Sequence, residues 1–271
     1  RGRAAMDRST GPRAKNNSGE EAMNTKHVGR VARVAIAAAL FAAPVQAQLP
    51  NANELLTRFR TAMGGEAAIK KHTSMHIQAE FEIPAQGMKG NVEIWSAVPD
   101  KFLSVVELPG VGTIKQGFDG TTAWALNPMV GAQLVTGKEL AQMKEQADMH
   151  SILHPEKFVK ARETVEKTTF DGKEAFKVKV TPIEGDEYHE FYEAATSLLI
   201  GTVRKLESPM GTMEATNVVS EYQDIDGQKI AMKMKQSMMG MDQIITIKKA
   251  EFVPVDPTVF EVPKEIKALV K

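Results

Sequence analysis

The chain has 271 residues, a formal net charge of zero at pH 7, 42% hydrophobic residues and no cysteine. The absence of cysteine excludes a disulfide framework, a thiol nucleophile and a cysteine-rich metal site. Removing residues 1–47, which carry eight basic and three acidic side chains, leaves 224 residues with a net charge of −5. A mildly acidic domain gives no electrostatic reason to expect nucleic acid or an anionic membrane as a partner.

The first 47 residues have the pattern of an export signal. Residues 1–22 are polar and basic, and we interpret them as an over-extended or disordered leader. Residues 23–47 begin with a basic stretch, continue as an alanine-rich apolar run over 34–43 and end with small residues after Pro44. The run is shorter than the roughly 20 residues that span a bilayer, so it predicts a secretory signal peptide rather than an anchor. No cysteine follows that could carry a lipid, so we expect a periplasmic protein with one domain over 48–271.

An amphipathic helix and several strands follow the signal. Apolar residues recur at helical spacing between Asn51 and Met63, and the Gly64-Gly65 pair ends this helix. From Met75 to Ile83, apolar and polar residues alternate, which predicts a strand with one buried and one solvated face. Further strands are expected at 92–96, 101–108, 112–118 and 121–127.

A helical insertion interrupts the strands. A Thr-x-x-Glu capping box before an apolar spacing predicts a helix from about 137 to 150, and a helical or irregular piece covers 151–160. The insertion could lie across a sheet as a lid, or it could pack on the sheet with no void beneath. Its apolar side carries Leu140, Met143, Phe158 and Val159.

Strands resume after the insertion and continue almost to the end. Asp171-Gly172 and Asp226-Gly227 are strong hairpin signals. Strands are expected at 161–169, 174–181, 188–193, 198–206, 213–222, 230–239 and 243–252. We therefore predict a mainly β (α+β) fold with about eleven strands, mostly antiparallel neighbours. Such a large sheet must cover one face, and curling around helices on its concave side would do so.

Four strings carry a resemblance to a known family: AMGGEAAIKK at 62–71, VPDKF at 98–102, FDGTTAW at 118–124 and DIDGQKIAMKMK at 224–235. Together with the order of elements, they resemble the LolA/LolB-like superfamily of outer membrane lipoprotein-sorting proteins over 51–263. The resemblance implies an unclosed antiparallel β-barrel with an N-terminal helix and a helical lid around an apolar cavity for acyl chains. It also implies a soluble carrier of the LolA type, with membrane-bound donor or acceptor proteins as partners.

The candidate ligand-binding residues are apolar. Aromatic side chains bury the most area, and methionine adapts to varied apolar partners, so either type could line a cavity or fill a core. A second reading of the methionines at 232–241 is a thioether site for Cu(I). The residues that we expect to bind a ligand are Trp95, Phe102, Trp124, Leu140, Met143, Phe158, Met232 and Met234.

Two histidine pairs have the spacing of metal ligands but lack the rest of a metal motif. His150 and His154 would share a helix face, yet Pro155 follows at once and no His-Glu-x-x-His pattern is present. His72 and His76 straddle the start of a strand. We therefore expect His150 and His154 to be surface histidines near a helix end, and we expect no resident metal or cofactor.

No catalytic motif accompanies these features. The chain has neither a Gly-x-Ser-x-Gly elbow nor a glycine-rich phosphate loop. The sequence favours a monomeric, non-enzymatic periplasmic carrier for lipoprotein acyl chains or other lipid-like ligands. The alternatives are an envelope structural or partner-binding module with a filled core, and a metal-binding protein that uses the methionines or His150 and His154.

Overall fold

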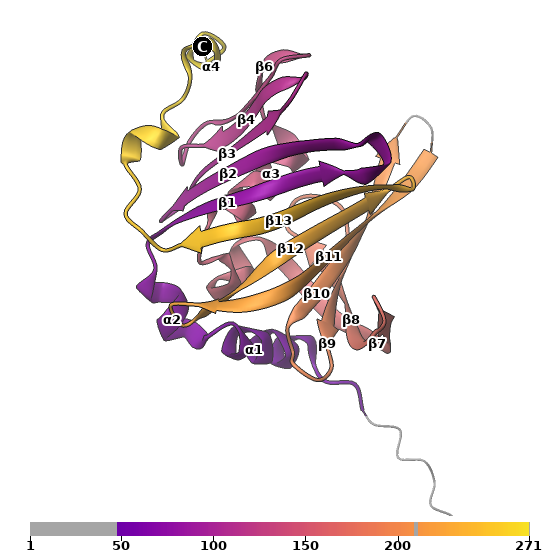
Figure 1. Cartoon of the computed structure of the whole chain (residues 1–271). Helices are drawn as coiled ribbons and strands as arrows, with labels where there is room; N and C mark the ends of the chain where they lie inside the picture. Colours follow the sequence, from indigo (N-terminus) through magenta and orange to yellow (C-terminus); the bar gives the residue numbers. More distant parts are fainter. Residues whose placement is uncertain (1–47, 209–210, 271) are drawn as a thin grey trace, which may run out of the picture. The chain divides into compact units, whose positions relative to one another are not determined.

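One antiparallel sheet of thirteen strands dominates the fold (Figure 1). The computed structural model describes residues 48–208 and 211–270, so the predicted leader (1–22) and signal peptide (23–47) lie outside the described residues. The strands are β1 (Ser74–Ile83), β2 (Met88–Ala97), β3 (Lys101–Leu108), β4 (Gly112–Phe118), β5 (Ala123–Asn127), β6 (Gly131–Leu134), β7 (Val159–Phe170), β8 (Lys173–Pro182), β9 (Tyr188–Glu193), β10 (Leu199–Ser208), β11 (Gly211–Ile225), β12 (Gln228–Met238) and β13 (Met241–Glu251).

The order of strands across the sheet explains how its two edges are connected. It runs β6-β5-β4-β3-β2-β1-β13-β12-β11-β10-β9-β8-β7, so the only neighbours that are not consecutive in the chain are β1 and β13. The edge strands β6 and β7 are consecutive in the chain, and no ladder joins them in the described residues. The sheet is therefore an unclosed barrel, as expected. The segment between its two free edges is the predicted helical insertion.

The sequence gives a range for twelve of the thirteen strands, close to the total of about eleven that it predicts. The strand that it missed is β6, which has four residues. Alternation of apolar and polar residues is informative only over longer stretches. A strand of four residues is therefore hard to detect from the sequence.

Helices are few and short. They are α1 (Ala52–Ala62), α2 (Gly65–Lys71), α3 (Gly137–Ala147) and α4 (Lys264–Lys267), with 3₁₀ turns η1 (Pro84–Gln86), η2 (Ser151–Leu153), η3 (Pro155–Lys157) and η4 (Pro257–Phe260). The side chain of Asn51 accepts the backbone N–H of Asn53 and caps α1, whereas Thr136 caps α3 without a side-chain hydrogen bond. α3 ends three residues before the predicted boundary, and η2 and η3 complete the insertion.

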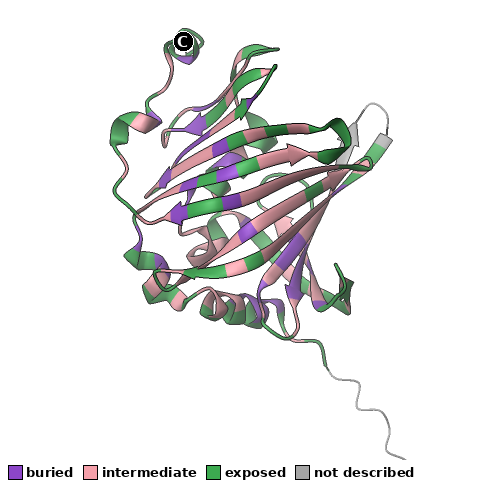
Figure 2. Cartoon of the chain, viewed as in Figure 1, coloured by how far each residue is buried: buried purple, intermediate pink, exposed green. Residues whose placement is uncertain are grey.

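The concave face of the sheet is covered at its two ends. α1 places Leu55 against Val178 and Val180 of β8. α3 lies inside the curl of the sheet and packs Met143 against Phe102 of β3 (Figure 1). Between them, β12 and β13 are mostly of intermediate burial (Figure 2).

The C-terminal segment covers part of the convex face. Phe260 of η4 and Ile266 of α4 are buried in one cluster with Trp124 of β5 and Leu103 of β3. Gly117 of β4 makes room for the indole, because a Cβ there would lie 2.7 Å from an atom of Trp124. The C-terminal segment is thus part of the core on this side.

Both hairpin turns that the sequence predicted are present. Asp171 and Gly172 join β7 to β8 with φ angles of 47° and 75°, and Asp226 and Gly227 join β11 to β12 with φ angles of 50° and 86°. Two consecutive positive φ angles match the right-handed twist of the flanking strands, which is why Asp-Gly is favoured in such turns.

Candidate ligand-binding site

An apolar floor lies on the concave face between the two helix-covered ends. We use this name for the cluster of Ile77, Ala79, Val92, Met232, Ile247 and Ala250 with the half-buried Met75, Phe81, Ile94, Val106, Ile230 and Ile245. All these residues belong to strands β1, β2, β3, β12 and β13, and in the described part of the chain no helix residue joins the cluster. Residues that pair directly across antiparallel strands share a face, so Met234, which pairs with Ile245, extends this floor.

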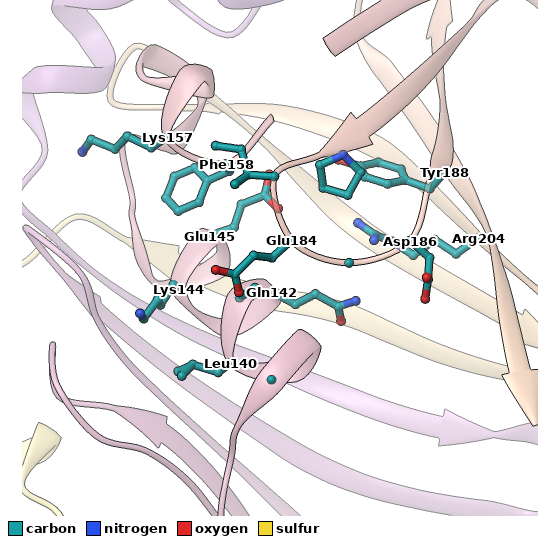
Figure 3. Close-up of a pocket in the computed structure, with 15 residues that line it drawn as sticks. Leu140, Gln142, Lys144, Glu145, Lys157, Phe158, Glu184, Asp186, Tyr188 and Arg204 are labelled. Carbon is teal, nitrogen blue, oxygen red and sulfur yellow. The ribbon is translucent and has the colours of Figure 1, made fainter. Parts of the chain in front are cut away.

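A cavity of about 340 Å³ lies on the concave side of the sheet, between α3 and strands β8 to β10. Its size is at the lower end of the range for small-molecule pockets, about 300–1,000 Å³. Leu140 and Glu145 of α3 form one wall, Phe158 closes one side, and Tyr188 and Arg204 come from the sheet (Figure 3). The cavity therefore has an apolar part and a charged part.

A buried ion pair lies on the concave face of the sheet next to the cavity. Nε of Arg162 on β7 is 3.5 Å from Oε2 of Glu190 on β9, and only 11% and 10% of the two side chains are exposed. The hydroxyl of Tyr192 donates to Oε2 of Glu190 at 2.7 Å, and that of Tyr188 donates to Oε1 at 3.4 Å. Several partners thus hold the Glu190 carboxylate, as a buried charge requires.

Two further charged groups face the cavity itself. The guanidinium of Arg204 on β10 stacks over the ring of Tyr188, with its carbon 3.7 Å from the ring centre. On α3, burial raises the pKa of the Glu145 carboxyl, and the positive charge of Arg204 opposes that shift. No ion pair joins Arg204 to an acidic residue within 4.0 Å in the described part of the chain.

Polar contacts join the insertion to the rest of the domain. Nζ of Lys138 on α3 lies 2.7 Å from Oδ1 of Asp186 in the β8–β9 loop. Nε of Arg60 on α1 donates to the backbone oxygen of Ile152 at 2.7 Å. Nε2 of His150 lies 3.0 Å from the backbone oxygen of His72. The insertion also packs Met143 and Ala147 into a buried cluster with Phe102, so both polar and apolar contacts hold it on the sheet.

The structure separates the eight predicted binding residues into different places. Leu140 and Phe158 line the cavity. Met232 belongs to the apolar floor, and Met234 extends it. Phe102 and Met143 contact each other beneath α3 in a buried cluster.

The two tryptophans do not join the others. Trp95 pairs with Leu103, and Trp124 packs with Leu103 under the C-terminal segment, so both lie on the convex face. Trp95 lines a separate hollow there with Val105 and Val259. Alternation explains this result, because Trp95 and Ile94 are adjacent on one strand and must point to opposite faces.

Two of these histidines lie near carboxylates. Nε2 of His76 lies 2.9 Å from a carboxylate oxygen of Glu93, and Nδ1 of His154 lies 3.8 Å from one of Glu156. In the described ranges, no three residues among His, Asp and Glu are grouped so that they could hold a metal ion. The same ranges contain no helix that is both long and apolar enough to cross a membrane.

Comparisons with known proteins give matches in structure alone. No family model matches the chain, and no curated protein matches its sequence. A DUF1329 family protein from Desulfovibrio piger is similar with a TM-score of 0.55 and 12% identity, over 77% of this chain and 95% of that one. A LolA superfamily protein from Nitrosomonas europaea has a TM-score of 0.53 and 10% identity, over 79% of this chain and 99% of that one.

A third similar structure is a domain from Vibrio parahaemolyticus whose name refers to outer membrane lipoprotein sorting. It has a TM-score of 0.52 and 13% identity, over 77% of this chain and 95% of that one. The chain has the LolA-like fold. At these identities the likeness covers the fold, so the resemblance drawn from the sequence is confirmed at that level.

Sequence reasoning missed the charged residues of the site. Arg162, Glu190 and Arg204 each lie in an expected strand, where a charged residue usually marks the solvated face. The signal in the sequence was the alternation of faces along β9, which places Glu190 on the same face as Tyr188 and Tyr192. An acidic residue between two aromatic residues on one face indicates a buried carboxylate that accepts hydrogen bonds from phenol hydroxyls.

Proposed function

We propose that the protein is a periplasmic, non-enzymatic carrier or binding protein for lipid-like ligands, which it holds against the concave face of its half-barrel. The observation that carries this proposal is the apolar floor. A sheet of this size has to cover its apolar face. In the described part of the chain no helix residue joins the floor, and its half-buried members, such as Phe81, Ile230 and Ile245, keep exposed apolar surface. An acyl chain would complete the cover, at about 0.8 kcal/mol for each buried CH₂ group.

Three further points support the proposal. The cavity lies on the same concave face as the floor, and Leu140 and Phe158 give it apolar surface of its own. The LolA-like fold is shared with a domain named for lipoprotein sorting. The predicted signal peptide would deliver the protein to the periplasm, where lipids and lipoproteins need an aqueous carrier. Lipoprotein acyl chains and free lipids are both candidate ligands, and hand-over would involve membrane-bound donor or acceptor proteins.

The test is a titration of the full chain with a neutral naphthylamine dye whose fluorescence rises in an apolar environment. We expect saturable binding to the wild-type protein and a large loss of affinity in Met234→Glu, which puts a charge on the floor. Thr246→Glu is the matched control, because Thr246 is also half-buried but lies on the convex face of the neighbouring strand. Equal binding by the two variants, both with wild-type unfolding temperatures, would refute the proposed site.

A further inference from the structure

The position and environment of Arg204 indicate that the cavity recognises a charged group as well as an apolar chain. Arg204 lies in the middle of β10 and pairs with Tyr188 on the neighbouring strand β9. Its side chain is on the concave face and lines the cavity (Figure 3). Arg162, on the same face, is neutralised by Glu190 at 3.5 Å. Arg204 has a tyrosine ring in place of such a carboxylate. The cavity thus contains one guanidinium that is positioned by stacking and still has its hydrogen-bond donors available.

No acidic residue that lines the cavity forms an ion pair with Arg204 in the described part of the chain. Asp186 at the rim is engaged by Lys138, and Glu184 lies exposed at the mouth. Glu145 is the acid that faces inward with Arg204, and no ion pair within 4.0 Å joins the two side chains in the described ranges. Of the other basic residues at the cavity, Lys157 contacts Asp148, 3.3 Å away, and Lys144 is exposed to solvent. Arg204 is therefore the cation best placed to meet a ligand.

The apolar and cationic parts of the cavity lie on opposite sides of one small space. Leu140 and Phe158 form the apolar side, and Arg204 with Tyr188 forms the charged side. A guanidinium presents two parallel N–H donors, a geometry that matches a carboxylate or a phosphate. We propose that this cavity selects amphiphiles with an anionic headgroup, and that Arg204 binds the carboxylate or phosphate while the chain packs against Leu140 and Phe158.

This inference rests on the proposed lipid-binding function and specifies the chemical class of its ligand. The test is calorimetric titration of the full chain with decanoate, decyl phosphate and decanol, which share a chain and differ in headgroup. We expect the two anions to bind at least about tenfold more tightly than the alcohol, as a charge-assisted hydrogen bond would give. Decanol binding as tight as that of the anions would overturn the headgroup inference and leave the lipid-binding function standing. Failure of all three to bind would refute both.

Variants connect the selectivity to one residue. Arg204→Gln should remove the advantage of the anions and leave decanol binding unchanged, whereas Glu145→Gln should strengthen anion binding. Lys205→Gln is the matched control, since Lys205 is the next residue on β10, exposed on the opposite face. Retention of full selectivity in Arg204→Gln with a wild-type unfolding temperature would overturn the assignment.

Inorganic phosphate separates a headgroup site from a simple anion site. We expect millimolar phosphate to leave decyl phosphate binding almost unchanged, because the chain supplies much of the affinity. Competition by phosphate at the same concentration as decyl phosphate would contradict an amphiphile site and indicate that the cavity binds a free anion.

Discussion

Nζ of Lys138 and Oδ1 of Asp186 lie 2.7 Å apart and connect the first turn of α3 to the β8–β9 loop at the rim of the cavity. This is the contact that must break if α3 moves away from that loop. Both side chains are more than half exposed, at 64% and 56%, so the ion pair adds little to global stability. Its effect should therefore appear in the exchange of ligand rather than in unfolding.

The first prediction concerns this contact. Lys138→Asp and Asp186→Lys, each alone, place like charges together and should speed ligand dissociation while changing the free energy of unfolding by no more than about 1 kcal/mol. The double variant restores an ion pair in reversed order and should restore slow dissociation. Stopped-flow release of the naphthylamine dye measures the rates. A double variant that releases dye as fast as the single variants would show that the contact does not control exchange.

The second prediction concerns the buried ion pair. Glu190→Gln leaves Arg162 without its counter-charge in a buried position, so the free energy of unfolding should fall by about 3 kcal/mol or more. Urea denaturation measures the change. Glu163→Gln is the control, because Glu163 follows Arg162 on β7 with 73% of its side chain exposed, and it should stay within about 1 kcal/mol of wild type. Equal losses in the two variants would contradict the role of the pair.

The third prediction concerns pH and Glu145. Burial raises the pKa of this carboxyl in the folded state, so the folded state holds the proton more tightly than the unfolded chain. Stability should therefore fall as pH rises through the pKa of the unfolded chain towards the raised folded value. Glu145→Gln removes the cost of ionisation and should be more stable than wild type at neutral pH, with the gain vanishing below about pH 4.

Urea denaturation at pH 7.5 and at pH 4 tests this relation. Glu139→Gln serves as the control, because Glu139 is an exposed position on the same helix. If Glu145→Gln is less stable than wild type at neutral pH, the prediction is wrong. The fold would then stabilise the ionised carboxylate of Glu145, most directly through Arg204.

The fourth prediction separates the convex core from the ligand site. Phe260→Ala should lower the free energy of unfolding by about 3 kcal/mol, because Phe260 is buried against Trp124 and truncation leaves a cavity. The same variant should bind the dye with wild-type affinity at temperatures where it is folded. Loss of dye binding in the folded variant would instead connect the tryptophan cluster to ligand uptake.

Local features of the fold were predictable because their causes are local. The alternation from Met75 to Ile83 defines β1, and the Asp-Gly turns define two hairpins, since each depends on neighbouring residues alone. The pairing of β1 with β13 joins residues more than 150 positions apart, and the sequence of neither strand indicates which strand it pairs with. The unclosed barrel was therefore expected from the resemblance and not from the pattern of residues.

The candidate site was predictable in its apolar part and not in its charged part. Methionines at 232 and 234 and the apolar side of the insertion mark surfaces that must be covered, which hydrophobicity reveals. The roles of Arg204 and Glu145 depend on which strand and which helix face each other across the cavity. This arrangement forms only when α3, which connects β6 to β7, packs on the sheet. The spacing of Glu145 and Arg204 in the sequence therefore does not indicate that they face one cavity.

The most direct test of the account is native mass spectrometry of the protein released from a bacterial envelope without detergent, combined with solvent extraction of its lipids. We predict a population with about one bound amphiphile per chain, and an extract enriched in that compound relative to Met234→Glu purified in parallel. A protein that shows only its unliganded mass, yields no lipid and takes up no added fatty acid would contradict the account.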